Sequence, residues 1–207
     1  MIALFVHGMG RSPFSGWRLL RDLRRAGFET CTFSYSVAFE KYDAIVARLR
    51  TRIALLAATG EYIVIGHSLG GVLLRAALNS LPPGSALPRR AYLLGSPVLP
   101  ARLATRLRNN RLFRVIAGEC GQLLGSAERM NVVGPLSVPT MGIVGIRGFS
   151  GRYSPFGDEA NDGLVSVSEA VAPWFSSCVH VPVIHPLLPS SARVARLIVQ
   201  DLAQQAG

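Results

Sequence analysis

Short apolar runs alternate with longer amphipathic stretches along the chain. Six of the short runs are apolar or β-branched and are bounded by turn residues, which predicts strands at residues 2–6, 29–35, 62–65, 90–94, 140–146 and 177–183. Five longer stretches carry apolar residues at helical spacing, which predicts helices at residues 14–26, 41–58, 69–80, 101–117 and 192–203. Strands that alternate with helices indicate an α/β fold with a mostly parallel sheet of about six strands and helices on both faces.

The composition agrees with a sheet that is buried on both of its faces. Of the 207 residues, 49% are hydrophobic and only 16% are charged. A chain of this length forms one core without help from disulfides or metals, so we expect a single domain over residues 1–207. We expect residues 98–137 to form a small cover segment on it.

The sequence lacks the usual signatures of disulfides, metals and nucleotides. Its cysteines, Cys31, Cys120 and Cys178, are scattered, and neither paired Cys/His motifs nor phosphate-binding glycine motifs occur. We therefore expect no cofactor and no metal. Met1 leads directly into the first apolar run, and no uninterrupted apolar stretch reaches the length of a membrane span, so we expect a cytoplasmic protein.

The chain is strongly basic, with a formal net charge of +10, which favours anionic partners. The basic residues are almost all arginines, and they are spread over several predicted helices without interleaved aromatic residues, so we expect no nucleic-acid partner. Residues 101–117 combine arginines with apolar residues. This stretch predicts either a basic cover that meets an anionic membrane surface or a sheet-packing helix with a solvated arginine face.

The apolar run at residues 62–65 leads into a G-x-S-x-G pattern centred on Ser68, and a helical stretch follows directly. A sharp turn from strand to helix would hold the Ser68 hydroxyl above the end of the sheet and aim the Leu69 amide at a developing oxyanion. The alternative is a structural serine that caps the helix. The order of elements favours Ser68 as a nucleophile.

Other polar residues follow the predicted strands at the same edge of the sheet. His185 follows the sixth strand and is the candidate base, with His180 inside that strand as the alternative. Asp162 follows the fifth strand and is the candidate acid that orients the base, with Asp158 as the alternative. In parallel sheets the ligand crevice lies beyond the carboxyl ends of the strands, so these groups are expected to meet there.

Four segments carry a resemblance to a known family. Residues 7–10 (His-Gly-Met-Gly) resemble the oxyanion loop of α/β-hydrolases, residues 66–71 their nucleophile elbow and residues 161–165 their acid turn, while His185 resembles their catalytic histidine. Within that fold the chain resembles small bacterial lipases and esterases. The family usually has two further strands before the first, so the resemblance implies a minimal α/β-hydrolase fold.

The resemblance also implies a function. It implies that the chain is a serine hydrolase that cleaves small-molecule or lipid carboxylic esters through an acyl-enzyme on Ser68. The Met9 and Leu69 amides would be the oxyanion donors. A thioesterase or acyltransferase uses the same triad, and a catalytically silent α/β-hydrolase domain that binds a lipid or a protein is the alternative from another class.

Four apolar residues are expected near the crevice, where they either bind the substrate or belong to the core. They are Val98, Leu99, Leu187 and Leu188.

Overall fold

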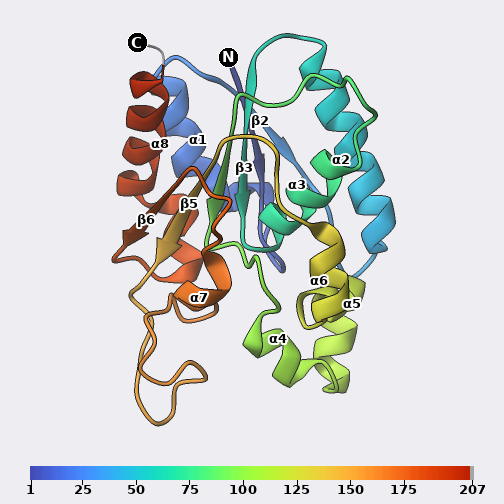
Figure 1. The fold of residues 1–207 in the computed structure, drawn as a ribbon, viewed down its shortest axis with the longest axis vertical. Coiled ribbons are helices and arrows are strands. Elements are labelled where there is room, and N and C mark those ends of the chain that lie inside the picture. The colour runs from blue at the N-terminus through green and yellow to red at the C-terminus, as the bar shows by residue number, and fades with distance from the viewer. Residues whose placement is uncertain (206–207) are drawn as a thin grey trace.

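The computed structural model describes residues 1–205, and its centre is a six-stranded sheet in which every strand is parallel to its neighbours (Figure 1). The strand order is β2-β1-β3-β4-β5-β6. The strands are β1 (Ile2–Val6), β2 (Glu29–Phe33), β3 (Tyr62–His67), β4 (Arg90–Leu94), β5 (Thr140–Gly145) and β6 (Ser177–Val181). The predicted α/β class and the six predicted strands are confirmed, with small shifts at the strand ends.

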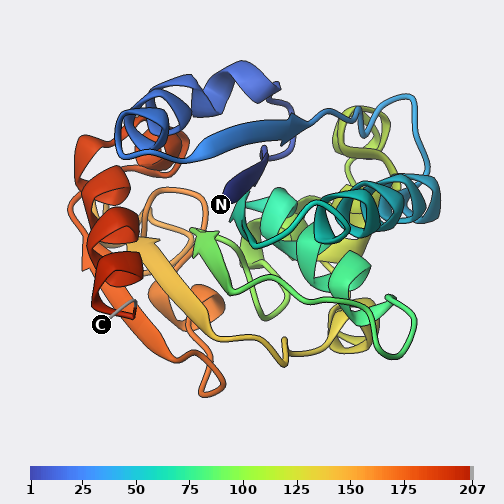
Figure 2. The same cartoon turned by 90° about the horizontal axis from the view of Figure 1, so that it is seen from above.

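Helices cover both faces of the sheet, as Figures 1 and 2 show. One face is covered by α1 (Trp17–Arg25) and α8 (Ala192–Gln204), and the other by α2 (Tyr42–Ala57) and α3 (Leu69–Asn79). Short 3-10 helices, Pro13–Gly16 and His185–Ser190, precede α1 and α8. Among residues 1–205, no helix combines the length and the hydropathy that a membrane-spanning segment requires.

The strands are apolar throughout because side chains on both faces are buried. In β1, Leu4 and Val6 pack into the core beneath α2 and α3, whereas Ala3 and Phe5 pack into the core beneath α1 and α8. All four side chains are fully buried. Successive side chains of a strand point to opposite faces, so a short continuous apolar run is what a strand between two helical layers requires.

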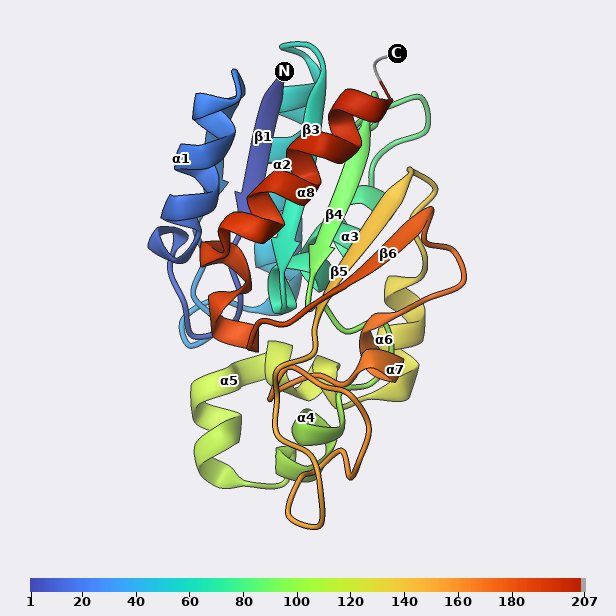
Figure 3. The same ribbon diagram turned by 90° about the vertical axis from the view of Figure 1, so that its left-hand side faces the viewer.

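A helical segment lies beyond the carboxyl ends of the strands (Figure 3). It contains α4 (Arg102–Leu107), α5 (Arg111–Leu124) and α6 (Ala127–Val133). The prediction of one helix over residues 101–117 is wrong, because the chain breaks between α4 and α5. The Asn110 side chain accepts a hydrogen bond from the Phe113 amide (3.1 Å) and so begins a new helix, which is the usual preference of asparagine at an N-cap.

Candidate active site

Ser68 lies in a sharp turn between β3 and α3. Its φ of 53° makes it the one non-glycine residue with positive φ in the described chain, a conformation that costs on the order of 1–3 kcal/mol. The Ser68 amide donates to the Leu94 carbonyl (2.9 Å), and the Ser68 carbonyl accepts from the Gly71 amide (3.0 Å). These two bonds hold the serine in its strained conformation at the carboxyl edge of the sheet.

The turn depends on a close approach of α3 to β1. A Cβ atom on Gly70 would lie 2.2 Å from the Val6 carbonyl oxygen, so any larger residue would force the helix away from the strand. Such a contact between backbones is possible only for glycine. The second glycine of the G-x-S-x-G pattern is therefore a packing requirement of this turn.

Asp162 is buried and fully hydrogen-bonded. One carboxylate oxygen, Oδ1, accepts from the amides of Leu164 (3.0 Å) and Val165 (2.8 Å), and the other, Oδ2, lies 2.6 Å from His185 Nδ1. The His185 amide also donates to the Asp162 carbonyl (2.9 Å). The two residues are thus joined through both side chain and backbone, and the alternative acid, Asp158, is exposed.

Asn161 holds the loop that carries the acid. Its side-chain oxygen accepts from the Gly163 amide (2.9 Å), and its side-chain nitrogen donates to the carbonyls of Phe149 (3.1 Å) and Glu159 (2.9 Å). Sequence reasoning treated this residue only as part of a turn motif. Its buried side chain instead joins three separate points of the loop.

The hydrogen bond to Asp162 determines which nitrogen of His185 can act as a base. A carboxylate only accepts, so Nδ1 carries the proton and donates, which leaves Nε2 of the neutral ring with a free lone pair. His185 is buried, and it lines the same cavity as Ser68. The alternative base, His180, lies exposed within the edge strand β6.

Gly95, which follows β4, lies against this pair. Its φ is 53°, and a Cβ atom there would lie 2.8 Å from Asp162 Oδ2 and 3.2 Å from His185 Nδ1. A side chain at this position would push into the hydrogen bond between the two. Gly95 was not among the site residues predicted from the sequence.

Two further histidines flank the site. The His67 ring lies 4.8 Å from the His185 ring, and its Nε2 lies 3.0 Å from the His185 carbonyl oxygen. Burial, reinforced by the neighbouring His185, lowers the pKa of His67 well below its ordinary value of 6.5. His67 is therefore neutral at neutral pH, and its Nε2 proton is donated to the His185 carbonyl.

His7 is held in a similar way at the end of β1. Its ring stacks on Tyr35 with 4.3 Å between centroids, and the Tyr35 hydroxyl donates to the His7 carbonyl (2.8 Å). Burial lowers the pKa of His7, although its hydrogen bond to the Gly8 carbonyl acts in the opposite direction. His7 thereby fixes the start of the loop that carries Met9.

The two backbone amides expected to bind an oxyanion belong to Leu69 and Met9. Leu69 is the first residue of α3, where an amide has no partner within its own helix. Met9 belongs to the turn that follows β1, which is closed by a hydrogen bond from the Arg11 amide to the Gly8 carbonyl (3.3 Å), and Met9 lines the cavity beside Ser68. The oxyanion role of both amides stays a prediction.

A cavity of about 150 Å³ opens beside Ser68 and His185. Apolar side chains make up the rest of its wall. They come from the Met9 turn, from residues after β4, from α4 and α5, and from the acid loop: Met9, Pro97, Ala101, Leu103, Ala104, Leu107, Phe113, Leu124, Leu164 and Val165. An apolar pocket with a few convergent polar groups is the usual form of a site for a small organic ligand.

The four residues expected either to bind the substrate or to belong to the core do not line the cavity beside Ser68. Leu188 is buried in the core beneath α1 and α8, and Leu187 lines a separate hollow with Arg18 and Arg147. Val98 is buried, and its amide donates to the Glu169 carbonyl (2.7 Å), while the Leu99 side chain is half exposed. The structure places none of the four on the wall of the cavity beside Ser68, because α4 and α5 supply that wall instead.

Hydrogen bonds and a salt bridge connect the start of α4 to the segment that contains Asp162. The carboxylate of Glu169, in the short helix α7 (Val167–Ala170), accepts from the Ser166 amide (2.7 Å) and from the Arg102 amide at the beginning of α4. Glu159 forms a salt bridge with Arg102 (2.7 Å). Burial alone would raise the pKa of Glu159, but hydrogen bonds from Ser168 and Arg102 lower it to about 2.

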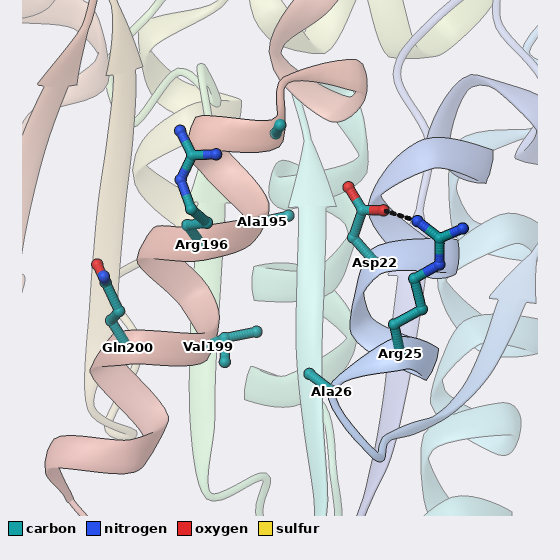
Figure 4. A pocket seen from close by; sticks show the side chains of 8 residues that line it. Asp22, Arg25, Ala26, Ala195, Arg196, Val199 and Gln200 are labelled. Atoms are coloured by element: carbon teal, nitrogen blue, oxygen red, sulfur yellow. Dashed lines mark ion pairs between the residues drawn. The ribbon is translucent and has the colours of Figure 1, made fainter.

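A larger hollow, of about 460 Å³, lies between α1 and α8 and is shown in Figure 4. Asp22 and Arg25 of α1 form an ion pair at its edge (3.9 Å), opposite Arg196 and Gln200 of α8. None of the candidate catalytic residues lines this hollow. Within residues 1–205, His, Cys, Asp and Glu side chains form no group of three or more that could hold a metal ion.

Solved structures similar to this one include hydrolases and related enzymes. One is the metagenomic carboxyl esterase MGS0156, with a TM-score of 0.69 and 17% identity over 97% of this chain and 74% of that one. Tomato Methylketone Synthase I complexed with 2-tridecanone has a TM-score of 0.65 and 13% identity over 99% of this chain and 98% of that one. The RedJ thioesterase of the prodiginine pathway from Streptomyces coelicolor has a TM-score of 0.60 and 14% identity over 98% of this chain and 84% of that one. At these identities the likeness is one of fold. No curated protein sequence matches the chain. The model of the Alpha/beta hydrolase family matches residues 3–202, and the chain belongs to that family.

Proposed function

We propose that the chain is a serine hydrolase that cleaves carboxylic esters through an acyl-enzyme on Ser68. The observation that carries the proposal is the 2.6 Å contact between His185 and Asp162, with His185 and Ser68 on the wall of one apolar cavity. A serine in a strained turn, a histidine of fixed tautomer and a buried carboxylate together supply nucleophile, base and orienting acid. A domain that only binds a lipid or a protein has no need of all three.

The reaction follows from these roles. The Ser68 hydroxyl attacks the ester carbonyl while His185 Nε2 takes its proton, and Asp162 stabilises the imidazolium that forms. The Leu69 and Met9 amides donate to the oxyanion of the tetrahedral intermediate. His185 then returns the proton to the leaving alkoxide, and a water molecule, activated in the same way, releases the acid from Ser68.

The apolar wall of the cavity favours an aliphatic acyl group beside Ser68. Hydrolysis of p-nitrophenyl esters of increasing acyl length measures which chain the cavity accommodates. The same triad attacks thioesters, so matched esters and thioesters of one acyl length decide between the two substrate classes.

The test is intact mass after exposure to a fluorophosphonate. The wild-type protein should gain one adduct, and Ser68→Ala should gain none while its circular dichroism stays unchanged. Ser96→Ala is the matched control, because Ser96 also follows a strand at this edge of the sheet and its buried hydroxyl has no hydrogen-bond partner within the described chain. That variant should still form the adduct. A folded wild-type protein that forms no adduct would instead favour the catalytically silent domain.

A further inference from the structure

The outer side of α5 exposes aliphatic side chains to solvent. Leu112, Val115 and Ile116 are 68%, 74% and 57% exposed, and their spacing places them on one face of the helix. Single exposed apolar residues are normal on protein surfaces, but a group of three large aliphatic residues on one helix face is typical of a contact surface. We refer to these three residues as the α5 outer face.

Arginines surround the α5 outer face, and none of them forms a salt bridge with an acidic residue in the described part of the chain. Between residues 105 and 116 the chain carries four exposed arginines and no aspartate or glutamate, which gives this stretch a charge of +4: Arg106, Arg108, Arg111 and Arg114. Within residues 1–205, none of their guanidinium groups takes part in a salt bridge. Their charge is therefore available to an anionic partner.

A second segment with the same character lies at this end of the molecule. The loop after β5 exposes Phe149 (59%) and Tyr153 (85%), together with Arg147 and Arg152. The Arg152 guanidinium lies over the Tyr153 ring, 5.7 Å from its centroid. Figures 1 and 3 both show this loop and the α4–α5 segment extending beyond the carboxyl ends of the strands.

The exposed surface adjoins the candidate active site. Leu107 of α4 and Phe113 of α5 line the cavity beside Ser68, whereas the α5 outer face points to solvent. α5 is kinked at Gly118, where φ is 54°. The Ala101 amide donates to the Leu124 carbonyl (2.8 Å), and the Gln122 side chain donates to the Arg108 carbonyl (3.2 Å), so α4 is joined to the part of α5 that follows the kink. One pair of helices therefore separates the cavity from the basic, apolar surface.

We propose that this end of the molecule docks on an anionic lipid bilayer. The α5 outer face, with Phe149 and Tyr153, enters the boundary between headgroups and acyl chains, and the surrounding arginines bind the lipid phosphates. Exposed aliphatic side chains beside unpaired arginines favour a bilayer over nucleic acid, because a nucleic acid offers phosphates to the arginines but no apolar phase in which the aliphatic side chains could be buried. This docking goes beyond ester hydrolysis and does not require Ser68 to be active.

The experiment is cosedimentation with vesicles of pure phosphatidylcholine and with vesicles that contain phosphatidylglycerol, at low and high salt. All proteins carry Ser68→Ala, so that binding is measured without hydrolysis. Arg111→Gln/Arg114→Gln should weaken binding to the anionic vesicles roughly 30-fold, since each arginine near an anionic surface contributes about fivefold. Val115→Ser/Ile116→Ser should weaken it by about tenfold or more by removing the buried aliphatic groups.

Arg193→Gln/Arg196→Gln is the matched control, because it removes the same charge from exposed positions on α8. It should change binding less than threefold. The proposal is overturned if the protein that carries Ser68→Ala alone binds neither kind of vesicle, and an acidic protein would then be the partner that fits this surface. It is also overturned if the α8 variant loses as much affinity as the α5 arginine variant. Each variant is also prepared with Ser68 intact, and unchanged hydrolysis of a soluble butyrate ester then shows that the active site is undisturbed.

Discussion

His67 offers a test of how the site holds its base. Its buried ring donates from Nε2 to the His185 carbonyl (3.0 Å) and lies beneath the His185 ring. The residue does not line the cavity beside Ser68, so we expect its effect on the proposed reaction to pass through the position of His185. His67→Phe keeps an aromatic ring in the space and removes the donor.

Loss of the His67 donor should lower both the free energy of unfolding and kcat. A buried carbonyl left without a partner costs about 1–3 kcal/mol of unfolding free energy, and each kcal/mol shifts the melting temperature of a domain of this size by roughly 2–4 °C. A base displaced by about 1 Å can lower kcat on the order of 10²-fold. His67→Gln retains a side-chain donor and should recover part of both losses.

The pH dependence gives an independent check, because burial lowers the pKa of His67 well below its value of 6.5 in the unfolded chain. As the pH falls through 6.5, the unfolded chain binds a proton that the folded chain does not. The free energy of unfolding of the wild-type protein is therefore highest above pH 6.5. Below that pH it falls by up to about 1.4 kcal/mol per pH unit for this one proton. His67→Phe lacks this dependence, so the stability difference between wild type and variant should narrow from pH 7 to pH 5.

The assay is urea unfolding at pH 7 and pH 5, combined with kcat on a soluble butyrate ester at pH 7. His7 titrates in the same direction in both proteins, so its contribution cancels in the comparison. A stability difference that stays constant between the two pH values, together with a wild-type kcat in His67→Phe, would refute the reasoning.

Two further predictions concern the acid and the cavity. Asp162→Asn should lower kcat on the order of 10⁴-fold through the wrong histidine tautomer, while the exposed Asp158→Asn should leave kcat within twofold; equal losses in the two would show that Asp162 has no special role. Leu107→Trp should fill the cavity and lower kcat/KM for butyrate esters about tenfold or more relative to acetate esters, whereas Leu112→Trp on the outer side of α5 should not change this ratio. A chain-length profile that is the same in both tryptophan variants would contradict the assignment of the cavity as the acyl site.

The sheet and the polar residues at its edge were predictable because both follow from local sequence. Each strand is a short apolar run between turn residues, and parallel strands bring their carboxyl ends to one edge. The positions of Ser68, Asp162 and His185 at that edge follow from this rule. The strained φ of Ser68 also follows from its place between an apolar strand and a helix.

The wall of the cavity was not predictable, because it depends on contacts between distant parts of the chain. The start of α4 is set by the Glu169 carboxylate, which lies 67 positions away from the Arg102 amide that it binds. Helical periodicity depends only on neighbouring residues and does not indicate such a contact, so residues 101–117 were expected to be one helix. Leu188 was expected either beside the crevice or in the core, and the structure places it in the core, within the 3-10 helix that begins at His185 and precedes α8.

The contacts that place α4 also connect this helix to Asp162, the candidate acid. Glu169 and Glu159 bind Arg102 at the start of α4, and they lie on either side of Asp162 in the connection between β5 and β6. The connection that orients His185 is thus the connection that positions the helix lining the cavity. A displacement of α4 would act on Asp162 through this connection, so the shape of the cavity and the orientation of His185 depend on one connected set of hydrogen bonds and ion pairs.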